Sequence, residues 1–212
     1  EAACKAHGIK VTTVAAHEDG KADYSAEVAT LASAGGDAVA VIGYLDQGGK
    51  GIIQGSLDSG AFDTFILSDG MIGDSLTDAF GKSLNKSFGS LPGSTGKGAG
   101  VFAKVAGAAG IDPSGPYTGE SYDAAALIVL AMQASGSADR KGIADNVMAV
   151  ANGPGKKIYP GELKKGLELL ANGKAIDYEG ASSVTFTDVG EASGSFLEME
   201  VKGDDFKGIK QR

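Results

Sequence analysis

Tyr44 and Asp69 are the two side chains whose types and positions most directly suggest chemistry. Each follows a short apolar run, at residues 38–42 for the tyrosine and 64–67 for the aspartate. If these runs are neighbouring strands of a parallel sheet, their carboxyl ends meet at the edge where ligands bind in open α/β folds. A carboxylate accepts a strong hydrogen bond from an ammonium group, and an aromatic ring adds cation–π attraction. The pair therefore predicts a binding site for a small cation.

Each of these residues also has a purely structural interpretation. Asp69 precedes Gly70, and Asp-Gly is a common turn dipeptide. A tyrosine at a strand end is more often a half-buried packing residue, with its hydroxyl exposed to solvent, than a ligand-binding residue. On the residues alone, both interpretations stay open.

Other candidates for chemistry are weak. The two histidines, His7 and His17, fall at the ends of predicted elements, and no serine lies in a Gly-x-Ser-x-Gly turn. Cys4 is the one cysteine, and no histidine pair has the spacing of metal ligands. Residues 81–83 (Gly-Lys-Ser) end like a phosphate-binding loop, but Leu76 stands where that motif needs glycine. We therefore predict no catalytic residue, metal or cofactor, and no enzyme.

Composition narrows the function classes further. The chain has 212 residues, 42% of them apolar, which is enough for one or two domains with a core. Its 19 basic and 27 acidic residues give a net charge of −8, which disfavours nucleic acid as a partner. The longest apolar run, at 124–132, is about half the roughly 20 residues of a bilayer span, so no membrane insertion is expected.

Strand and helix patterns alternate along the first half of the chain. The spacing of apolar residues, with glycines at the boundaries, predicts strands at 9–14, 38–42, 64–67 and about 86–91, and helices at 24–34, 47–59 and 99–109. Alternating strands and helices favour a doubly wound α/β fold with a parallel sheet. The pair at positions 44 and 69 would then lie at the carboxyl edge of this sheet.

The second half is mainly helical. Prolines and glycines at 112–117 indicate a connector between two lobes. Helices are expected at 122–134, capped by Ser121, at 139–151, and from Pro160, while strands are expected only at 184–187 and 196–201. Two short strands form too little β-sheet to cover the apolar faces of three helices. Residues 1–7 also look like the tail of a helix without a start, so we expect the chain to begin inside a longer protein.

The sequence resembles the branched-chain amino acid binding proteins of bacterial ABC transporters, which have the type I periplasmic binding fold. The resemblance runs through nearly the whole chain and depends on the order and spacing of several segments. They are residues 43–46 (Gly-Tyr-Leu-Asp), 65–70, 112–117 before 122–125, 178–182 and 186–194.

The resemblance implies two lobes joined by three crossings, with the ligand between them. Residues 1–116 would form the second lobe, 117–193 the end of an incomplete first lobe, and 194–212 a return strand and tail. An acidic residue at position 69 receives the ligand's α-ammonium in this family, and an aromatic residue at position 44 closes over it. The best-known members carry Glu where this chain has Asp69, one methylene shorter. Donors to the α-carboxylate belong to first-lobe segments that this chain lacks.

The resemblance also implies the remaining site residues and the biological role. Tyr44, Asp69 and Gly70 would bind the ligand, with Leu45 and Tyr117 as further candidates. The protein would capture a small amino acid in the periplasm, after removal of a signal peptide from its precursor, and present it to an ABC permease at the inner membrane. The alternative is a ligand-sensing receptor or regulator of the same fold, with an amide, urea or aromatic-acid ligand.

Overall fold

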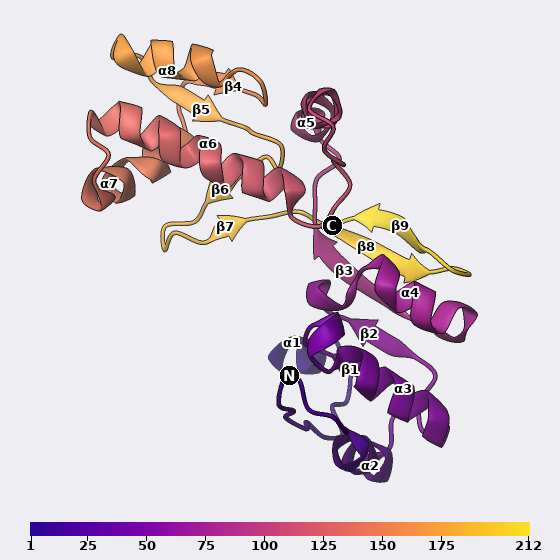
Figure 1. Cartoon of the computed structure of the whole chain (residues 1–212). Coiled ribbons are helices and arrows are strands. Elements are labelled where there is room, and N and C mark those ends of the chain that lie inside the picture. Colours follow the sequence, from indigo (N-terminus) through magenta and orange to yellow (C-terminus); the bar gives the residue numbers. More distant parts are fainter. The chain divides into compact units, whose positions relative to one another are not determined.

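A computed structural model describes all 212 residues, and the chain divides into two compact units (Figure 1). Unit 1 consists of Glu1–Leu91 and Glu198–Lys210, and unit 2 of Pro92–Leu197 and Gln211–Arg212. The boundaries expected from the sequence, after residues 116 and 193, assign segments to the lobes of a complete protein, and that assignment stays a prediction.

A five-stranded sheet in the order β1-β2-β3-β8-β9 forms the centre of unit 1 (Figure 1). Its parallel part consists of β1 (Val39–Val41), β2 (Phe65–Leu67) and β3 (Phe88–Pro92), in a register that pairs Val41 with Leu67. Helix α3 (Gly49–Ser59) connects β1 to β2, and α4 (Asp74–Phe80) connects β2 to β3. Each connection brings the chain back to the edge of the sheet at which the preceding strand began. The strands that it joins therefore run in the same direction, as in any parallel sheet.

The C-terminal strands β8 (Phe196–Val201) and β9 (Phe206–Gln211) complete the sheet as a hairpin. Phe196 and Arg212 exchange both backbone hydrogen bonds, at 3.0 and 2.8 Å, which is the pattern of antiparallel strands. The predicted α/β class is therefore confirmed, but the sheet is mixed rather than wholly parallel. The sequence predicted β8 correctly and missed β9, most of whose residues are exposed.

The strand predicted at residues 9–14 is wrong. The segment between α1 (Ala2–Ala6) and α2 (Ser25–Ala34) forms no strand, although it is rich in β-branched residues. Ile9 and Val14 are exposed at 58% and 68%. A strand here would therefore gain no stability from burying these side chains. Thr12 Oγ1 instead donates a hydrogen bond to the Gly35 carbonyl at 2.7 Å.

Apolar side chains from the helices and the sheet pack together in the core of unit 1. Ile53 of α3, Phe65 of β2 and Leu76 of α4 are completely buried. The apolar stripe of α3 thus faces the sheet, as its spacing in the sequence predicts. This packing fixes the carboxyl ends of β1 and β2.

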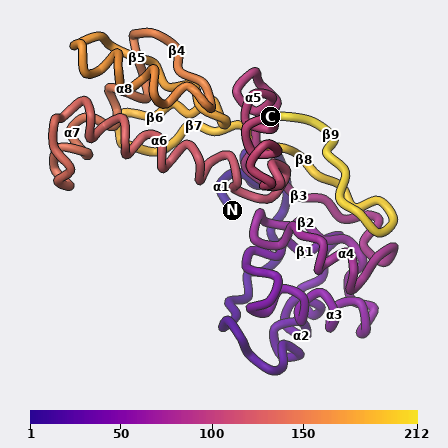
Figure 2. The backbone as a smooth tube through the Cα atoms, turned by 45° about the horizontal axis from the view of Figure 1, so that its top comes forward, coloured from indigo at the N-terminus to yellow at the C-terminus, as the bar shows by residue number.

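Four helices and two small sheets make up unit 2. Figure 2 traces its backbone from α5 to β7. The helices are α5 (Lys97–Ala108), α6 (Thr118–Ser135), α7 (Arg140–Ala151) and α8 (Leu163–Ala171). Strands β4 (Lys156–Ile158) and β5 (Ile176–Tyr178) pair in parallel, and β6 (Thr185–Phe186) pairs antiparallel with β7 (Ala192–Ser193). The sequence missed β4 and β5, because three-residue strands containing Lys156, Lys157 and Asp177 carry too little apolar signal.

Two predicted helix starts are wrong. Helix α6 begins at Thr118 after Tyr117, whose φ of 60° ends the preceding loop, so Ser121 lies inside the helix instead of capping it. Helix α8 begins at Leu163 instead of at Pro160. The helix predicted at 139–151 is confirmed, since the Asp139 carboxylate accepts from the Gly142 backbone N–H at 2.7 Å as an N-cap.

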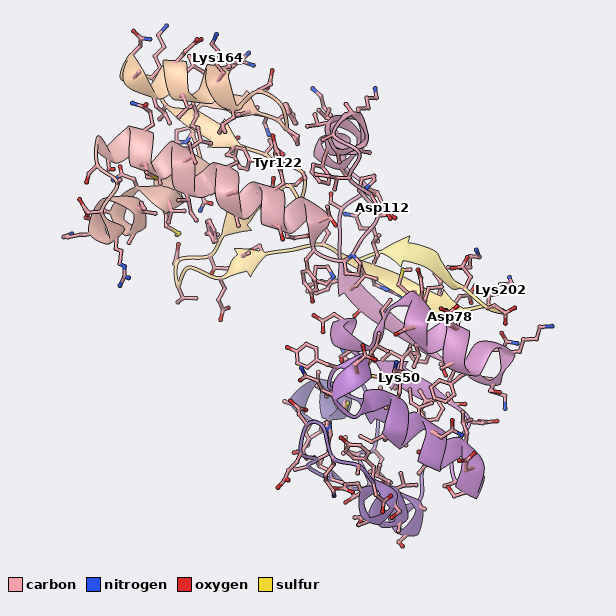
Figure 3. All side chains as sticks on the ribbon, in the orientation of Figure 1. Lys50, Asp78, Asp112, Tyr122, Lys164 and Lys202 are labelled. Atoms are coloured by element: carbon pink, nitrogen blue, oxygen red, sulfur yellow. The ribbon has the colours of Figure 1, made fainter.

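A buried carboxylate connects α6 to the segment after β5 in unit 2. Asp123 is 2% exposed and accepts four hydrogen bonds, at 2.7–2.8 Å, from the Tyr178 hydroxyl, the Ala181 and Ser182 backbone N–H groups, and the Ser182 hydroxyl. Gly180 turns the chain here with a φ of 58°. The ring of the neighbouring Tyr122 packs on Phe102 of α5, with 5.3 Å between centroids. Figure 3 labels Tyr122 on α6.

No helix of the chain is both long enough and apolar enough to cross a membrane. The apolar run at 124–132 lies within α6, where Leu127, Leu130 and Ala131 are buried. Ile128 and Val129 on the same helix are exposed. This run therefore contributes to both a buried and an exposed face of α6.

Candidate functional site

A cavity of about 350 Å³ lies in unit 1 at the carboxyl ends of β1 and β2. The residues that line it come from three segments: the loop before α2, the end of β1 and the end of β2. They are His17, Asp19, Ile42, Gly43, Tyr44, Ser68 and Asp69. The binding site predicted from the sequence lies at this same carboxyl edge of the parallel strands.

Backbone hydrogen bonds fix Tyr44 at one rim of this cavity. The Tyr44 carbonyl accepts from the Gln47 and Gly49 N–H groups, at 3.3 and 3.1 Å, as the chain enters the short 3₁₀ turn η1 (Leu45–Gln47). The Tyr44 side chain is 61% exposed. The structural interpretation, a half-buried packing residue, therefore does not describe this tyrosine, because its ring is available at the cavity.

Asp69 lines the cavity from the end of β2, at the start of the 3₁₀ turn η2 (Asp69–Met71). Its carboxylate accepts from the Gly70 N–H at 2.9 Å, and its carbonyl accepts from the Ile72 N–H at 3.1 Å. Met71, two residues after Asp69, is completely buried and anchors the turn in the core. The structural interpretation of Asp69 as a turn residue is therefore correct. The same residue also lines the cavity.

Close packing between the two strand ends holds the rims together. The Ser68 hydroxyl is 3.3 Å from both the Gly43 nitrogen and the Gly43 carbonyl oxygen, and it can accept from one and donate to the other. A Cβ on Gly70 would lie 2.5 Å from the Gly43 oxygen and 2.8 Å from Tyr44 Cδ1. Gly70 thus acts through its lack of a side chain, which lets the tyrosine ring approach the backbone.

The two remaining predicted residues lie elsewhere. Leu45 is partly buried and packs against the core of unit 1, and it does not line the cavity. Tyr117 belongs to unit 2, where it precedes α6. Roles of Tyr44, Asp69, Gly70, Leu45 and Tyr117 in ligand binding stay predictions.

Sequence reasoning missed five lining residues, which are His17, Asp19, Ile42, Gly43 and Ser68. His17 and Asp19 follow the segment at 9–14, but that segment forms no strand, so the rule about strand ends that selected Tyr44 and Asp69 does not apply to them. From the sequence, His17 was placed at the end of a predicted element and given no role. Ser68 could have been found from its position next to Asp69.

The lining residues define what the cavity can bind. Asp19 and Asp69 supply carboxylates, Tyr44 and His17 supply aromatic rings, and Ile42 supplies apolar surface. Carboxylates with an adjacent ring suit a ligand that carries an ammonium group. Nowhere in the chain do three or more His, Cys, Asp or Glu side chains gather as they would around a metal ion.

Comparisons with solved structures place this fold among known proteins. A leucine binding protein, LivK, from Thermotoga maritima has a TM-score of 0.66 and 19% identity, over 91% of this chain and 49% of that one. A periplasmic binding protein type 1 from Bordetella pertussis has a TM-score of 0.65 and 20% identity, over 98% of this chain and 55% of that one. A branched chain amino acid ABC transporter from Thermus thermophilus, solved with bound valine, has a TM-score of 0.64 and 15% identity, over 99% and 54%.

Comparison with curated proteins gives a shorter match. The chain is 36% identical over 70 residues to the chemotactic signal transduction system substrate-binding protein BasB of Halobacterium salinarum, which is 33% of this chain and 17% of that protein. No family model matches the sequence.

These similar proteins are named as binding proteins or transporters, not as enzymes. The chain spans about half the length of the solved structures that it matches. At these identities the likeness establishes the fold. The predicted resemblance is thus confirmed at that level: the chain has the type I periplasmic binding fold of the substrate-binding proteins of branched-chain amino acid ABC transporters.

Proposed function

We propose that this chain is the ligand-binding part of a solute-binding protein that captures a small amino acid by its ammonium group. The observation that carries the proposal is the cavity of unit 1, at which Tyr44 and Asp69 lie on the ends of two adjacent parallel strands. An ammonium group at Asp69 gains a charge-assisted hydrogen bond, and the exposed Tyr44 ring covers it.

The names of the structural relatives support a small ligand of this kind. One is a leucine binding protein, and another was solved with bound valine. A third, a solute binding protein from R. palustris, was solved in complex with benzoate. Because benzoate has no ammonium group, the fold alone does not select amino acids. The carboxylate of Asp69 is what favours an amino acid in this chain.

Lobe closure is the proposed mechanism. A ligand that contacts both lobes of the complete protein stabilises the closed state by its differential affinity for that state. The closed form would be recognised by an ABC permease at the inner membrane, and the protein would act in the periplasm. No covalent bond is made or broken in this cycle.

A second candidate is a sensing function, favoured by the match to BasB, whose name assigns it to a chemotactic signal transduction system. Ligand capture would be the same, but the closed form would bind a receptor instead of a permease. Co-purification of the ligand-loaded complete protein with either membrane partner separates the two.

A thermal-shift screen of the complete protein against the common L-amino acids tests the proposal. A ligand at 100 times its dissociation constant adds about 2.7 kcal/mol to the free energy of unfolding, which a melting curve detects. Asp69→Asn should weaken the binding of any hit by about 100-fold, because it removes the charge that receives the ammonium. Asp78→Asn is the matched control, an exposed aspartate on α4 of the same unit. Unchanged affinity in the Asp69 variant would refute the assignment.

A further inference from the structure

His17 is held at the cavity by the aromatic ring of Tyr24. The two rings meet edge to face, with 5.9 Å between centroids and an interplanar angle of 80°. Tyr24 is 6% exposed, and its hydroxyl lies within hydrogen-bond distance of the Glu18 and Gln47 carbonyls, at 3.1 and 3.3 Å. The same hydroxyl accepts from the Lys21 N–H at 3.0 Å. The loop that carries His17 is therefore fixed to Tyr24 by the ring contact and by the hydrogen bonds of Glu18 and Lys21, which follow His17 in the chain.

One edge of the imidazole faces the carboxyl end of β1. A Cβ on Gly43 would lie 3.2 Å from His17 Nε2 and 3.3 Å from Cε1. Gly43 itself lines the cavity, between Ile42 and Tyr44. The absence of a side chain at position 43 thus makes room for the Nε2 edge beside the site.

The other ring nitrogen, Nδ1, is buried and has no hydrogen-bond partner. Because an orphaned buried N–H group is rarer in proteins than an under-satisfied acceptor, we assign Nδ1 as the nitrogen that carries no hydrogen. Neutral imidazole has one donor and one acceptor nitrogen, which places the hydrogen on Nε2. His17 therefore offers a hydrogen-bond donor at the cavity.

We propose that His17 is a second polar ligand-binding residue of this site, whose Nε2–H donates to an oxygen atom of the ligand while Asp69 accepts from its ammonium. This inference rests on the proposed function and extends it. With the His17 donor and the Asp69 acceptor at the same cavity, the site favours a ligand that carries an acceptor oxygen close to its ammonium group. A plain alkylamine satisfies only Asp69.

Two parts of an amino acid can supply that oxygen, the α-carboxylate and a side-chain carbonyl. Three probes distinguish them. L-leucine has the carboxylate, isoamylamine has the same side chain and ammonium without the carboxylate, and L-asparagine replaces the branched side chain of leucine by a carboxamide of similar shape.

The experiment measures the affinity of the complete protein for these three probes by calorimetry. His17→Phe keeps the ring contact with Tyr24 and removes the donor, while His17→Gln restores an N–H near the same place. We expect His17→Phe to weaken the probe whose oxygen is recognised by about tenfold and His17→Gln to recover most of it. The exposed His7, at the end of α1, supplies the control substitution His7→Phe.

The outcomes separate the inference from the proposed function. A loss for leucine but not for isoamylamine assigns the α-carboxylate, and a loss confined to asparagine assigns the side chain. If Asp69→Asn abolishes binding while His17→Phe changes no probe, the inference is overturned and the proposed function stands. If no ligand of the thermal-shift screen binds the native protein, both fall.

Nitrogen NMR of the two histidines gives a readout independent of folding effects. At alkaline pH the ligand-free protein should show the Nε2–H tautomer for His17, and the bound probe should move its Nε2 resonance but not those of His7. A His17 ring with its hydrogen on Nδ1 would overturn the inference.

Discussion

Asp123 of unit 2 and Asp69 of unit 1 are two aspartates with opposite surroundings. Asp123 is buried, and four donors from its own chain surround its carboxylate. Asp69 is exposed and lines a cavity, where the Gly70 N–H is one of its donors. A carboxylate surrounded by its own chain stabilises the fold, whereas a carboxylate at a cavity can still receive a ligand.

The same contrast applies to the tyrosine beside each aspartate. The Tyr178 ring is 1% exposed and its hydroxyl donates to Asp123 at 2.8 Å. The Tyr44 ring is mostly exposed at the cavity. Tyr178 thus completes a buried hydrogen-bond network, whereas Tyr44 presents an exposed ring at the cavity.

The largest expected effect is the loss of Asp123. In Asp123→Ala the buried donors of Tyr178 and Ala181 lose their acceptor, which should lower the free energy of unfolding by roughly 3–5 kcal/mol. Denaturant unfolding measures it. Asp188→Ala, at an exposed position of the same unit, should change stability by less than about 0.5 kcal/mol. An equal loss of stability in Asp123→Ala and Asp188→Ala would contradict a stabilising role for the buried carboxylate.

The turn at Gly180 should be nearly as sensitive. Its φ is 58°, and an added Cβ would lie 2.3 Å from Oδ1 of the Asp123 carboxylate, far inside van der Waals contact. Gly190 also has a positive φ, of 84°, but a Cβ added there would meet no atom within 4 Å. Gly180→Ala should therefore cost about 2 kcal/mol more than Gly190→Ala, since both share the backbone strain and only the first disrupts the carboxylate. Denaturant unfolding of the two variants measures this difference, and equal losses would contradict it.

High pH should weaken the buried pair. Burial, and then the charge of Asp123, raise the pKa of the Tyr178 phenol well above its usual range. A raised pKa in the folded state means that the stabilisation is complete below the unfolded pKa, about 10, and is lost as pH rises above it. Between about pH 10 and 12, Tyr178→Phe should lose stability less steeply than the native protein, by up to about 1.4 kcal/mol per pH unit. Parallel stability curves for the two proteins would contradict this.

The smallest expected effect concerns the exposed ring of the cavity. Tyr44→Ala should weaken amino acid binding about fivefold, the size of a cation–π contact at an exposed site, and should leave the melting temperature unchanged. Tyr44→Phe keeps the ring face and should bind like the native protein. If Tyr44→Phe loses as much as Tyr44→Ala, the hydroxyl and not the ring contacts the ligand.

Local sequence patterns predicted the parts of the fold in which each element buries an apolar face. The runs that became β1, β2 and β8 and the stripe of α3 could be identified because burial and spacing agree in them. The run at 9–14 has the same β-branched composition, but its side chains are exposed, so propensity alone gave a strand that does not form. Strands β4 and β5 were missed for the opposite reason, since tertiary packing of α6 and α8 supports strands with little apolar content.

For the site, one rule about sheet edges found Tyr44 and Asp69 but not His17. The first two follow strands that a sequence shows clearly. His17 reaches the cavity through a loop fixed by Tyr24, a contact between residues whose packing no local pattern records. Likewise, nothing in the spacing showed that Leu45 would turn into the core.

A crystal structure of the complete protein with its amino acid bound tests the central claim most directly. The distance to measure is the one between the ligand's ammonium nitrogen and the nearer carboxylate oxygen of Asp69. We predict about 2.7–3.0 Å, a charge-assisted hydrogen bond, with the Tyr44 ring over the same group. An ammonium bound by other residues, with Asp69 facing solvent, would contradict the account.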